Sequence, residues 1–220
     1  DKTRKTEIKI FESIDATKVV VANKKLYVNR EEGFIGTSLK KDEYVSECSD
    51  IDNIIIIRNS GLLQVVKIDN KVFVGKDIIH VAVFKRKDVR TIYNMIYLDG
   101  KSGYSMIKRF NVSSITRNKE YSLTKSLTGS KILYLTSNPN GEAETVNVLL
   151  RKSPKLKILK FDFNFADLAI KGKGSGGNIL TKNKVKRIEL KSEGISTLSA
   201  RKIWFDDNVN LSLIHISEPT

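Results

Sequence analysis

The sequence predicts an all-β protein built from about four hairpin-based blades around a common axis. First, segments rich in Ile, Val, Tyr and Phe are separated by short turns of Asn, Gly, Ser and Asp, which is typical of strands and hairpins. Second, no window carries a helical apolar stripe longer than about two turns. Third, a hairpin followed by a short extended segment recurs four times at intervals of about 39 residues, as in arrays of β-blades.

The first two predicted hairpins start at Val19 and Ile54. In each, β-branched residues form the outgoing strand and polar residues or glycine form the turn. In the first hairpin, the outgoing strand is predicted at residues 19–22, the turn at 23–25 and the return strand at 26–28. In the second, the outgoing strand is predicted at residues 54–57, the turn at 59–61 and the return strand at 62–66.

The third and fourth predicted hairpins start near Tyr93 and at Ile132. Their turns contain the glycines and asparagines that tolerate unusual backbone angles. In the third hairpin, the turn is predicted at residues 99–103 and the return strand at 104–107. In the fourth, the turn is predicted at residues 137–141 and the return strand at 145–150. Successive hairpins start 35, 39 and 39 residues apart, which predicts one blade per repeat.

Each hairpin is followed by a second extended segment. Residues 33–39 and 72–78 align at an offset of 39 and share an aromatic residue, a β-branched residue and a glycine in the same order. The third unit has a looser version at residues 110–115. In the fourth unit, residues 151–165 are predicted as an insertion before a glycine-rich version at residues 170–180. The repeating unit is therefore a hairpin plus a second segment.

The ends of the chain lie outside this pattern. Residues 1–17 are predicted as a lead-in from an upstream domain, because the chain starts without Met, and residues 18–210 as the blade domain. Residues 211–220 match a translated sequencing adapter, so we predict that they are not native. Cys48 is the only cysteine, which excludes an internal disulfide and predicts a plain buried thiol in a cytoplasmic protein. Apolar runs are too short to span a membrane.

Positive charge is the second strong feature of the sequence. The chain has 39 Lys and Arg against 25 Asp and Glu, a net charge of +14. Residues 1–100 contribute 18 basic and 15 acidic side chains, a net of +3, and residues 101–220 contribute the remaining +11. A basic excess of this size favours a polyanionic partner, because phosphate contacts release condensed counterions. A highly charged solvated surface without a partner is the alternative.

Residues 172–177 satisfy the G-x-G-x-x-G spacing of dinucleotide-binding loops. Such a loop must open a helix, whose N-terminus faces the pyrophosphate. Here the following residues alternate as in a strand, so we reject a dinucleotide site. The glycines still allow a ligand to approach the backbone, and Lys171 and Lys173 flank them. We expect a nucleic-acid phosphate there, with a flexible surface loop as the alternative.

Further basic clusters recur at the ends of successive repeats, where they would form a continuous basic belt. We expect this belt to bind double-stranded DNA through the backbone, with little base readout. Strand alternation places Lys184, Lys186 and Ile188 on one face and Val185 and Arg187 on the other. The candidate DNA-binding residues are Lys85, Arg86, Lys87, Arg90, Lys108, Arg109, Lys171, Gly172, Lys173, Gly174, Lys182, Lys184, Lys186 and Arg187.

No catalytic or metal site is predicted. With His215 in the adapter, His80 is the only native histidine, and no carboxylate–histidine spacing is typical of a metal site or a catalytic triad.

Four stretches resemble one family: residues 5–8, 28–48, 138–144 and 177–182. They are similar to the C-terminal domain of the bacterial type IIA topoisomerase A subunit, and the resemblance extends over about residues 3–208. It implies a β-pinwheel, a propeller-like disc whose blades exchange strands and whose basic rim contacts DNA. It also implies the B subunit of the topoisomerase as a partner, a bacterial nucleoid-associated location, and ATP and magnesium only elsewhere in the enzyme.

Within that family, the resemblance is closer to topoisomerase IV, whose domain engages the transported DNA segment, than to gyrase, whose domain wraps DNA. Residues 171–177 lack the Gln-Arg-Arg of the gyrase box. The strand-cleaving tyrosine of the family follows an arginine, and none of the seven tyrosines here does. We therefore expect a chain that binds DNA and cannot cut it. Gyrase-like wrapping and a β-propeller protein-interaction module remain the alternatives.

Overall fold

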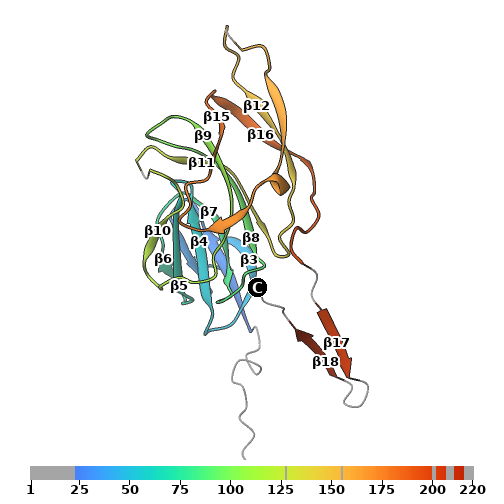
Figure 1. The fold of residues 1–220 in the computed structure, drawn as a ribbon. Coiled ribbons are helices and arrows are strands. Elements are labelled where there is room, and N and C mark those ends of the chain that lie inside the picture. The colour runs from blue at the N-terminus through green and yellow to red at the C-terminus, as the bar shows by residue number, and fades with distance from the viewer. Residues whose placement is uncertain (1–22, 127, 155, 200–201, 207–210, 216–220) are drawn as a thin grey trace, which may run out of the picture.

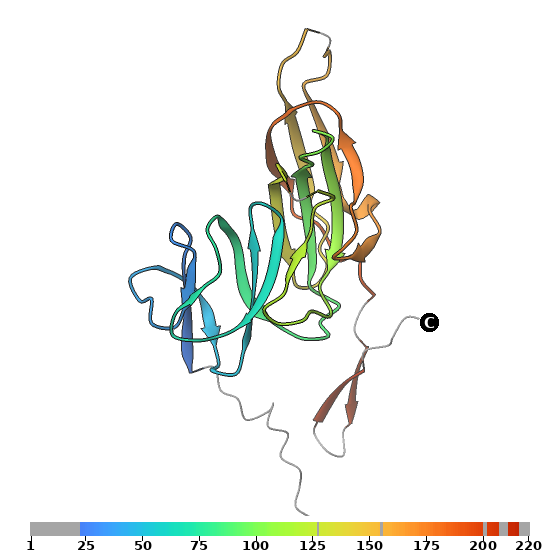
Figure 2. The same ribbon diagram turned by 90° about the vertical axis from the view of Figure 1, so that its left-hand side faces the viewer.

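The computed structural model describes residues 23–126, 128–154, 156–199, 202–206 and 211–215, and the strands there form four sheets plus a separate β-ribbon. Sheet 1 has the order β3 (Glu43–Cys48), β1 (Lys24–Asn29), β2 (Phe34–Gly36), β6 (Val72–Phe73). Sheet 2 has the order β10 (Glu120–Ser122), β5 (Leu62–Lys67), β4 (Asn53–Arg58), β7 (Ile78–Phe84). Figures 1 and 2 show the sheets following one another along the molecule.

Sheet 3 contains β11 (Lys131–Asn138), β8 (Ile92–Leu98), β9 (Ser105–Asn111) and β14 (Ile170–Gly172), and β15 (Asn178–Thr181) also pairs with β9. Sheet 4 has the order β13 (Lys160–Asn164), β12 (Thr145–Leu150), β16 (Val185–Ser192). A 3-10 turn at Phe165–Asp167 follows β13, and β17 (Lys202–Asp206) pairs with β18 (Leu211–His215). The all-β prediction is confirmed.

The sheets share one construction rule. Each begins with a hairpin, and a later strand returns to pair with the first strand of that hairpin, as β3, β7, β11 and β16 do. The next repeat then donates strands to the other edge: β6 pairs with β2, β10 with β5, and β14 and β15 with β9. Neighbouring blades are therefore joined by exchanged strands as well as by their faces.

The core consists of three apolar layers between successive sheets. Ile54 and Ile56 pack toward sheet 1, whereas Ile55 and Ile57 pack toward sheet 3. All four are at most 1% exposed, since β4 is covered on both faces and successive side chains point to opposite faces. In β8 the same alternation directs Tyr93 and Met95 to sheet 2 and Ile96 to sheet 4. The continuous isoleucine run is thus the signature of a central blade.

The predicted hairpins agree with the structure in part. The second and third hairpins are confirmed as β4–β5 and β8–β9. In the first, residues 19–22 lie outside the described residues, and Lys24 and Lys25 extend strand β1 instead of forming a turn. The fourth prediction is wrong, because β11 pairs with β8 of sheet 3 whereas β12 pairs with β13 and β16.

That error has a structural cause. Residues 131–138 correspond to the returning strands β3 and β7, not to the start of a hairpin. Most of the predicted insertion at residues 151–165 is instead the loop and the return strand β13 of the fourth hairpin, which starts at β12. The structure has four hairpins, but two differ from the prediction: the first is β1–β2, in which the predicted turn and return strand form the outgoing strand, and the fourth begins 13 residues later than predicted.

Several smaller predictions can also be compared with the structure. Cys48 is a free thiol and 1% exposed, and burial raises its pKa, as expected for a plain buried cysteine. Among the described residues, no helix is long and apolar enough to cross a membrane. The predicted lead-in at residues 1–17 lies outside the described residues. The adapter origin of residues 211–220 and the predicted domain limits stay predictions.

Candidate nucleic-acid interface

The glycine-rich segment lies along strand β9. β14 pairs with Arg109–Asn111 in the parallel direction, and β15 pairs with Ser105–Ile107 in the antiparallel direction. Residues 173–177 connect them in a tight turn, followed by a strand as predicted and not by a helix. Gly177 has φ +76°, and a Cβ there would lie 2.4 Å from the Ile107 carbonyl oxygen, so the turn needs glycine at this position.

Three side chains hold this glycine-rich turn, residues 172–177, against sheets 2 and 3. Lys108 Nζ donates to the carbonyl oxygens of Lys173 at 2.9 Å and Ser175 at 2.8 Å. Tyr97 Oη donates to the Gly176 carbonyl at 2.5 Å. Lys173 Nζ reaches back to the Ser114 carbonyl at 2.8 Å. The turn is therefore fixed at several points, which argues against the alternative of a flexible surface loop.

Aromatic rings support several of the surface lysines. Lys173 Nζ lies 5.0 Å from the ring centroid of Tyr121, and Lys119 Nζ lies 5.5 Å from the same ring. Lys182 Nζ lies 5.6 Å from the centroid of Tyr104. Cation–π contacts of this kind restrain long side chains while leaving the ammonium groups at the surface.

The structure joins basic clusters that are distant in the sequence. The turn containing Lys85, Arg86 and Lys87 is tied to residues 112–116, because the Lys87 amide donates to the Ser113 carbonyl at 3.0 Å. Lys173 bonds the next carbonyl, that of Ser114. The cluster after β7 and the glycine-rich turn therefore meet at one loop, although 84 residues separate Lys87 from Lys171.

The positive surface continues toward sheet 4. The side chain of Lys125 lies beside Gly176, and the Lys101 amide bonds Ser126 in the same region. Past Lys182, the Arg151 amide donates to the Lys184 carbonyl at 2.8 Å. We call the exposed and half-buried cations of these segments the basic belt; it comprises Lys85, Arg86, Lys87, Lys101, Lys119, Lys125, Arg151, Lys171, Lys173, Lys182, Lys184, Lys186 and Arg187.

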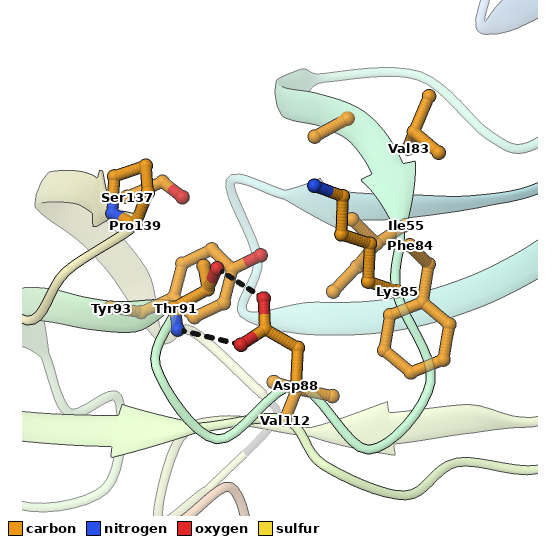
Figure 3. A pocket seen from close by; sticks show the side chains of 11 residues that line it. Ile55, Val83, Phe84, Lys85, Asp88, Thr91, Tyr93, Val112, Ser137 and Pro139 are labelled. Atoms are coloured by element: carbon orange, nitrogen blue, oxygen red, sulfur yellow. Dashed lines mark hydrogen bonds between the residues drawn. The ribbon is translucent and has the colours of Figure 1, made fainter. Parts of the chain in front are cut away.

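A cavity of about 210 Å³ lies beside the first part of the belt, between sheets 2 and 3. The Lys85 amine, the Asp88 carboxylate and the Tyr93 hydroxyl point into it (Figure 3). Burial acts to raise the pKa of Asp88, but hydrogen bonds from Thr91 and from the Arg90 and Thr91 amides outweigh it and lower that pKa. Asp88 therefore shapes the Lys85–Arg90 turn as a carboxylate.

Three of the predicted residues do not belong to the open surface. Lys108 and Arg109 are 2% and 1% exposed, so the prediction that they face a DNA backbone is corrected. Alternation along β9 points Lys108 toward sheet 2 and Arg109 toward sheet 4, and both bond protein groups. Arg90 is half-buried and its guanidinium bonds the Ser199 carbonyl at 3.2 Å.

The predicted faces of β16 also need correction. The register shifts between the pairs Leu149–Arg187 and Leu150–Val185, which places a β-bulge around Lys186. Val185 and Ile188 consequently both pack against the core, although they are three positions apart in the strand. Arg187 forms an exposed ion pair with Glu189 at 2.9 Å. Lys184 and Lys186 remain exposed, as the belt requires.

Sequence reasoning missed Lys101 and Lys125, together with the rings of Tyr104 and Tyr121, whereas Lys119 forms a basic cluster with Arg117 in the sequence. Lys101 and Lys125 each stand alone in the sequence and lie in a turn or loop, so no local cluster marks them. The alternation of Lys119 with Tyr121 was a usable signal, since basic residues interleaved with aromatic ones are typical of nucleic-acid surfaces.

Comparison with known proteins places the chain in a family. A solved structure, the C-terminal domain of DNA topoisomerase IV, superposes with a TM-score of 0.53 and 10% identity, over 76% of this chain and 61% of that one. At this identity the match shows the fold, a β-pinwheel.

The A subunit of DNA topoisomerase 4 from Borreliella burgdorferi is 31% identical over 120 residues, which are 54% of this chain and 19% of that protein. The chain thus matches about a fifth of its curated relative. The family model of the topoisomerase C-terminal domain of Bacteroidota matches residues 25–193, most of the chain, and the chain therefore belongs to that family.

Proposed function

We propose that this chain is the DNA-binding part of the A subunit of a topoisomerase IV-like enzyme, and that it holds duplex DNA along the basic belt. The observation that carries the proposal is that basic segments far apart in the sequence contact one another in sheets 2, 3 and 4. Isolated surface lysines are common and carry no such meaning, whereas cations gathered from several segments suit a polyanion.

The chemistry of the belt favours contacts to the DNA backbone. Its members are lysines and arginines in turns and at strand ends, where they reach phosphates without entering a groove. The blades contain no described helix that could read the major groove. Binding should therefore be strongly salt-dependent and nearly independent of sequence, which suits capture of any DNA segment by the intact enzyme.

A salt titration with a labelled duplex tests the proposal. Each phosphate contact contributes about 0.9 to the slope of log affinity against log salt concentration. Replacing Lys171, Lys173, Lys184 and Lys186 with Glu should reduce that slope by about 3 to 4 and weaken binding to all sequences alike. A matched control changes four exposed lysines by the same total charge: Lys24 and Lys25 on β1, and Lys40 and Lys41 in the turn between β2 and β3.

The control separates a local belt from the overall net charge. Equal losses in both variants, or an effect confined to one DNA sequence, would contradict belt binding. Absence of binding even at low salt would leave the protein-interaction module as the better interpretation.

Ligation of nicked plasmid in the presence of the chain distinguishes the two topoisomerase roles. A topoisomerase IV-like domain should leave the linking number unchanged, because residues 171–177 lack Gln-Arg-Arg. A shift that grows with protein concentration would instead indicate gyrase-like wrapping. The chain alone should not cleave DNA, and the reaction would need the rest of the A subunit together with the B subunit, plus ATP and magnesium.

A further inference from the structure

The glycines of the glycine-rich turn fall into two classes. Gly177 is required by the fold, because it has positive φ and no room for a Cβ. Gly172 and Gly174 have neither property: neither has positive φ, and a Cβ at either would meet nothing within 4 Å. Packing inside the chain therefore gives no reason for glycine at these two positions. Their effect is to leave the backbone uncovered toward solvent, where a ligand can approach it closely.

Lys108 lies at a buried position, where removing a charged side chain from water costs free energy. Its side chain is 2% exposed, and it lies on the face of β9 that also carries Met106 and Phe110. The ammonium lies 4.5 Å from the Phe110 ring centroid and bonds two carbonyls of the glycine-rich turn. An apolar side chain would suit the surrounding core better. The lysine is explained if its task is to hold the turn.

The carbonyl directions determine where the amides of the turn point. In a trans peptide the C=O of one residue and the N–H of the next point in opposite directions, and the described residues contain no cis peptide. Lys108 draws the carbonyls of Lys173 and Ser175 inward, so the amides of Gly174 and Gly176 face away from it. No hydrogen bond to another described residue satisfies either amide. Lys125 lies beside Gly176.

We propose that Lys108 is the positioning residue of a phosphate-binding turn, in which the outward amides of Gly174 and Gly176 hold one phosphate of the DNA backbone. The inference rests on the proposed function, since the phosphate belongs to the duplex bound along the belt. Two convergent backbone amides form an anion site without a side chain, and neighbouring cations strengthen it. Lys108 does not touch the phosphate and acts only through the backbone of the turn.

The pH dependence of DNA binding distinguishes the proposed role of Lys108 from a role in packing, because only the proposed role depends on its charge. Burial lowers the pKa of Lys108 to about 7, so the ammonium loses its proton around neutral pH. The titratable groups on the elements packed around it are Tyr97 on β8, Tyr121 on β10, and Lys173 and Lys125 at the turn. Charge-assisted hydrogen bonds to the two carbonyls weaken when the proton leaves. Affinity for DNA should then fall as pH rises.

Four single variants of the 220-residue chain test this inference with the same labelled duplex. Lys108→Met should lose about tenfold in affinity at pH 6, where the parent ammonium is charged, the effect of a hydrogen bond to a charged group. Lys108→Arg keeps a charged donor and should stay within about threefold of the parent. Gly174→Ala places a methyl group over the amide and should lose a similar factor to Lys108→Met, with an unchanged melting temperature. Lys173→Gln probes the belt itself.

The pH series uses the parent and both Lys108 variants. Between pH 6 and 9 the affinity of the parent should fall toward that of Lys108→Met, whereas both variants should show no change in this range. Unchanged binding by Lys108→Met or by Gly174→Ala would overturn the inference, as would a flat pH profile of the parent. If Lys173→Gln and the fourfold belt variant also bind like the parent, the proposed function fails instead, so the two failures are distinguishable.

Discussion

Arg109 should contribute more to stability than any surface ion pair of this chain. Its side chain is 1% exposed, and it donates to Asn94 Oδ1 and to the Gly141 carbonyl, both at 3.0 Å. Asn94 in turn donates to the Glu144 carboxylate at 2.7 Å, and Glu144 is 4% exposed. Replacing Arg109 with Met leaves the buried Asn94 amide oxygen without its donor. It also removes the cation that balances the buried Glu144 carboxylate, which keeps its hydrogen bonds from Asn94 and Thr136.

Breaking a buried charge network on one side costs about 3–5 kcal/mol, which for a domain of this size lowers the melting temperature by about 10 °C. Urea unfolding followed by circular dichroism measures the change. Arg30→Met is the matched control, because the Arg30–Glu43 pair is 37% and 53% exposed and should contribute less than about 1 kcal/mol. Adding Glu144→Gln to Arg109→Met should recover about 1–3 kcal/mol. Equal costs for Arg109→Met and Arg30→Met, or no recovery in the double variant, would refute this account.

Two further predictions concern backbone strain and acid. Gly177→Ala should destabilise the chain by about 1–3 kcal/mol and weaken DNA binding, because φ is +76° and the Ile107 carbonyl occupies the space of the new methyl group; a melting temperature like that of Gly174→Ala would contradict this. Burial lowers the pKa of His80 to about 4, so its contribution to stability is complete above its ordinary pKa of about 6.5 and is lost as pH falls from there to 4. Hydrogen bonds from Ser102 and Ser126 hold the pKa of Asp99 at about 2, and its contribution is lost at still lower pH, between about 4 and 2. Urea midpoints measured against pH should show both declines, and His80→Leu should remove only the first.

The strands could be predicted wherever local residues decide the turn. Residues 59–61 join β4 and β5 with Gly61 at φ +87°, and residues 99–103 join β8 and β9 with a side-chain cap from Asp99. Both hairpins follow from turn chemistry. Partner choice is not local, however: β11 has the composition of a hairpin strand, yet it pairs back onto β8. Strand exchange between repeats leaves no mark within about ten residues of each strand, so it could not be predicted from turn patterns.

In the candidate site, too, local sequence predicted some residues correctly and failed for others. Charged residues in turns and loops, such as Lys85 and Lys184, were predicted on the surface and are exposed. Lys108 and Arg109 were predicted there too, although they lie between Ile107 and Phe110 in a run that is apolar on both sides. Such a run is typical of a strand covered on both faces, where a charged residue must find a buried partner. That pattern was the available signal for the interior position of both cations.

Strand exchange gives the belt its geometry. The glycine-rich turn belongs to the fourth repeat, but its flanking strands β14 and β15 complete sheet 3, and its carbonyls satisfy Lys108 of that sheet. The position of the turn relative to the Lys85–Lys87 cluster is therefore fixed by backbone pairing and not by the side chains of the belt. Loss of the fourth repeat would uncover the edge of β9 and leave Lys108 without acceptors. A belt assembled in this way can change its surface cations one by one while the spacing between them stays constant, because the exchanged strands, and not the cations, set that spacing.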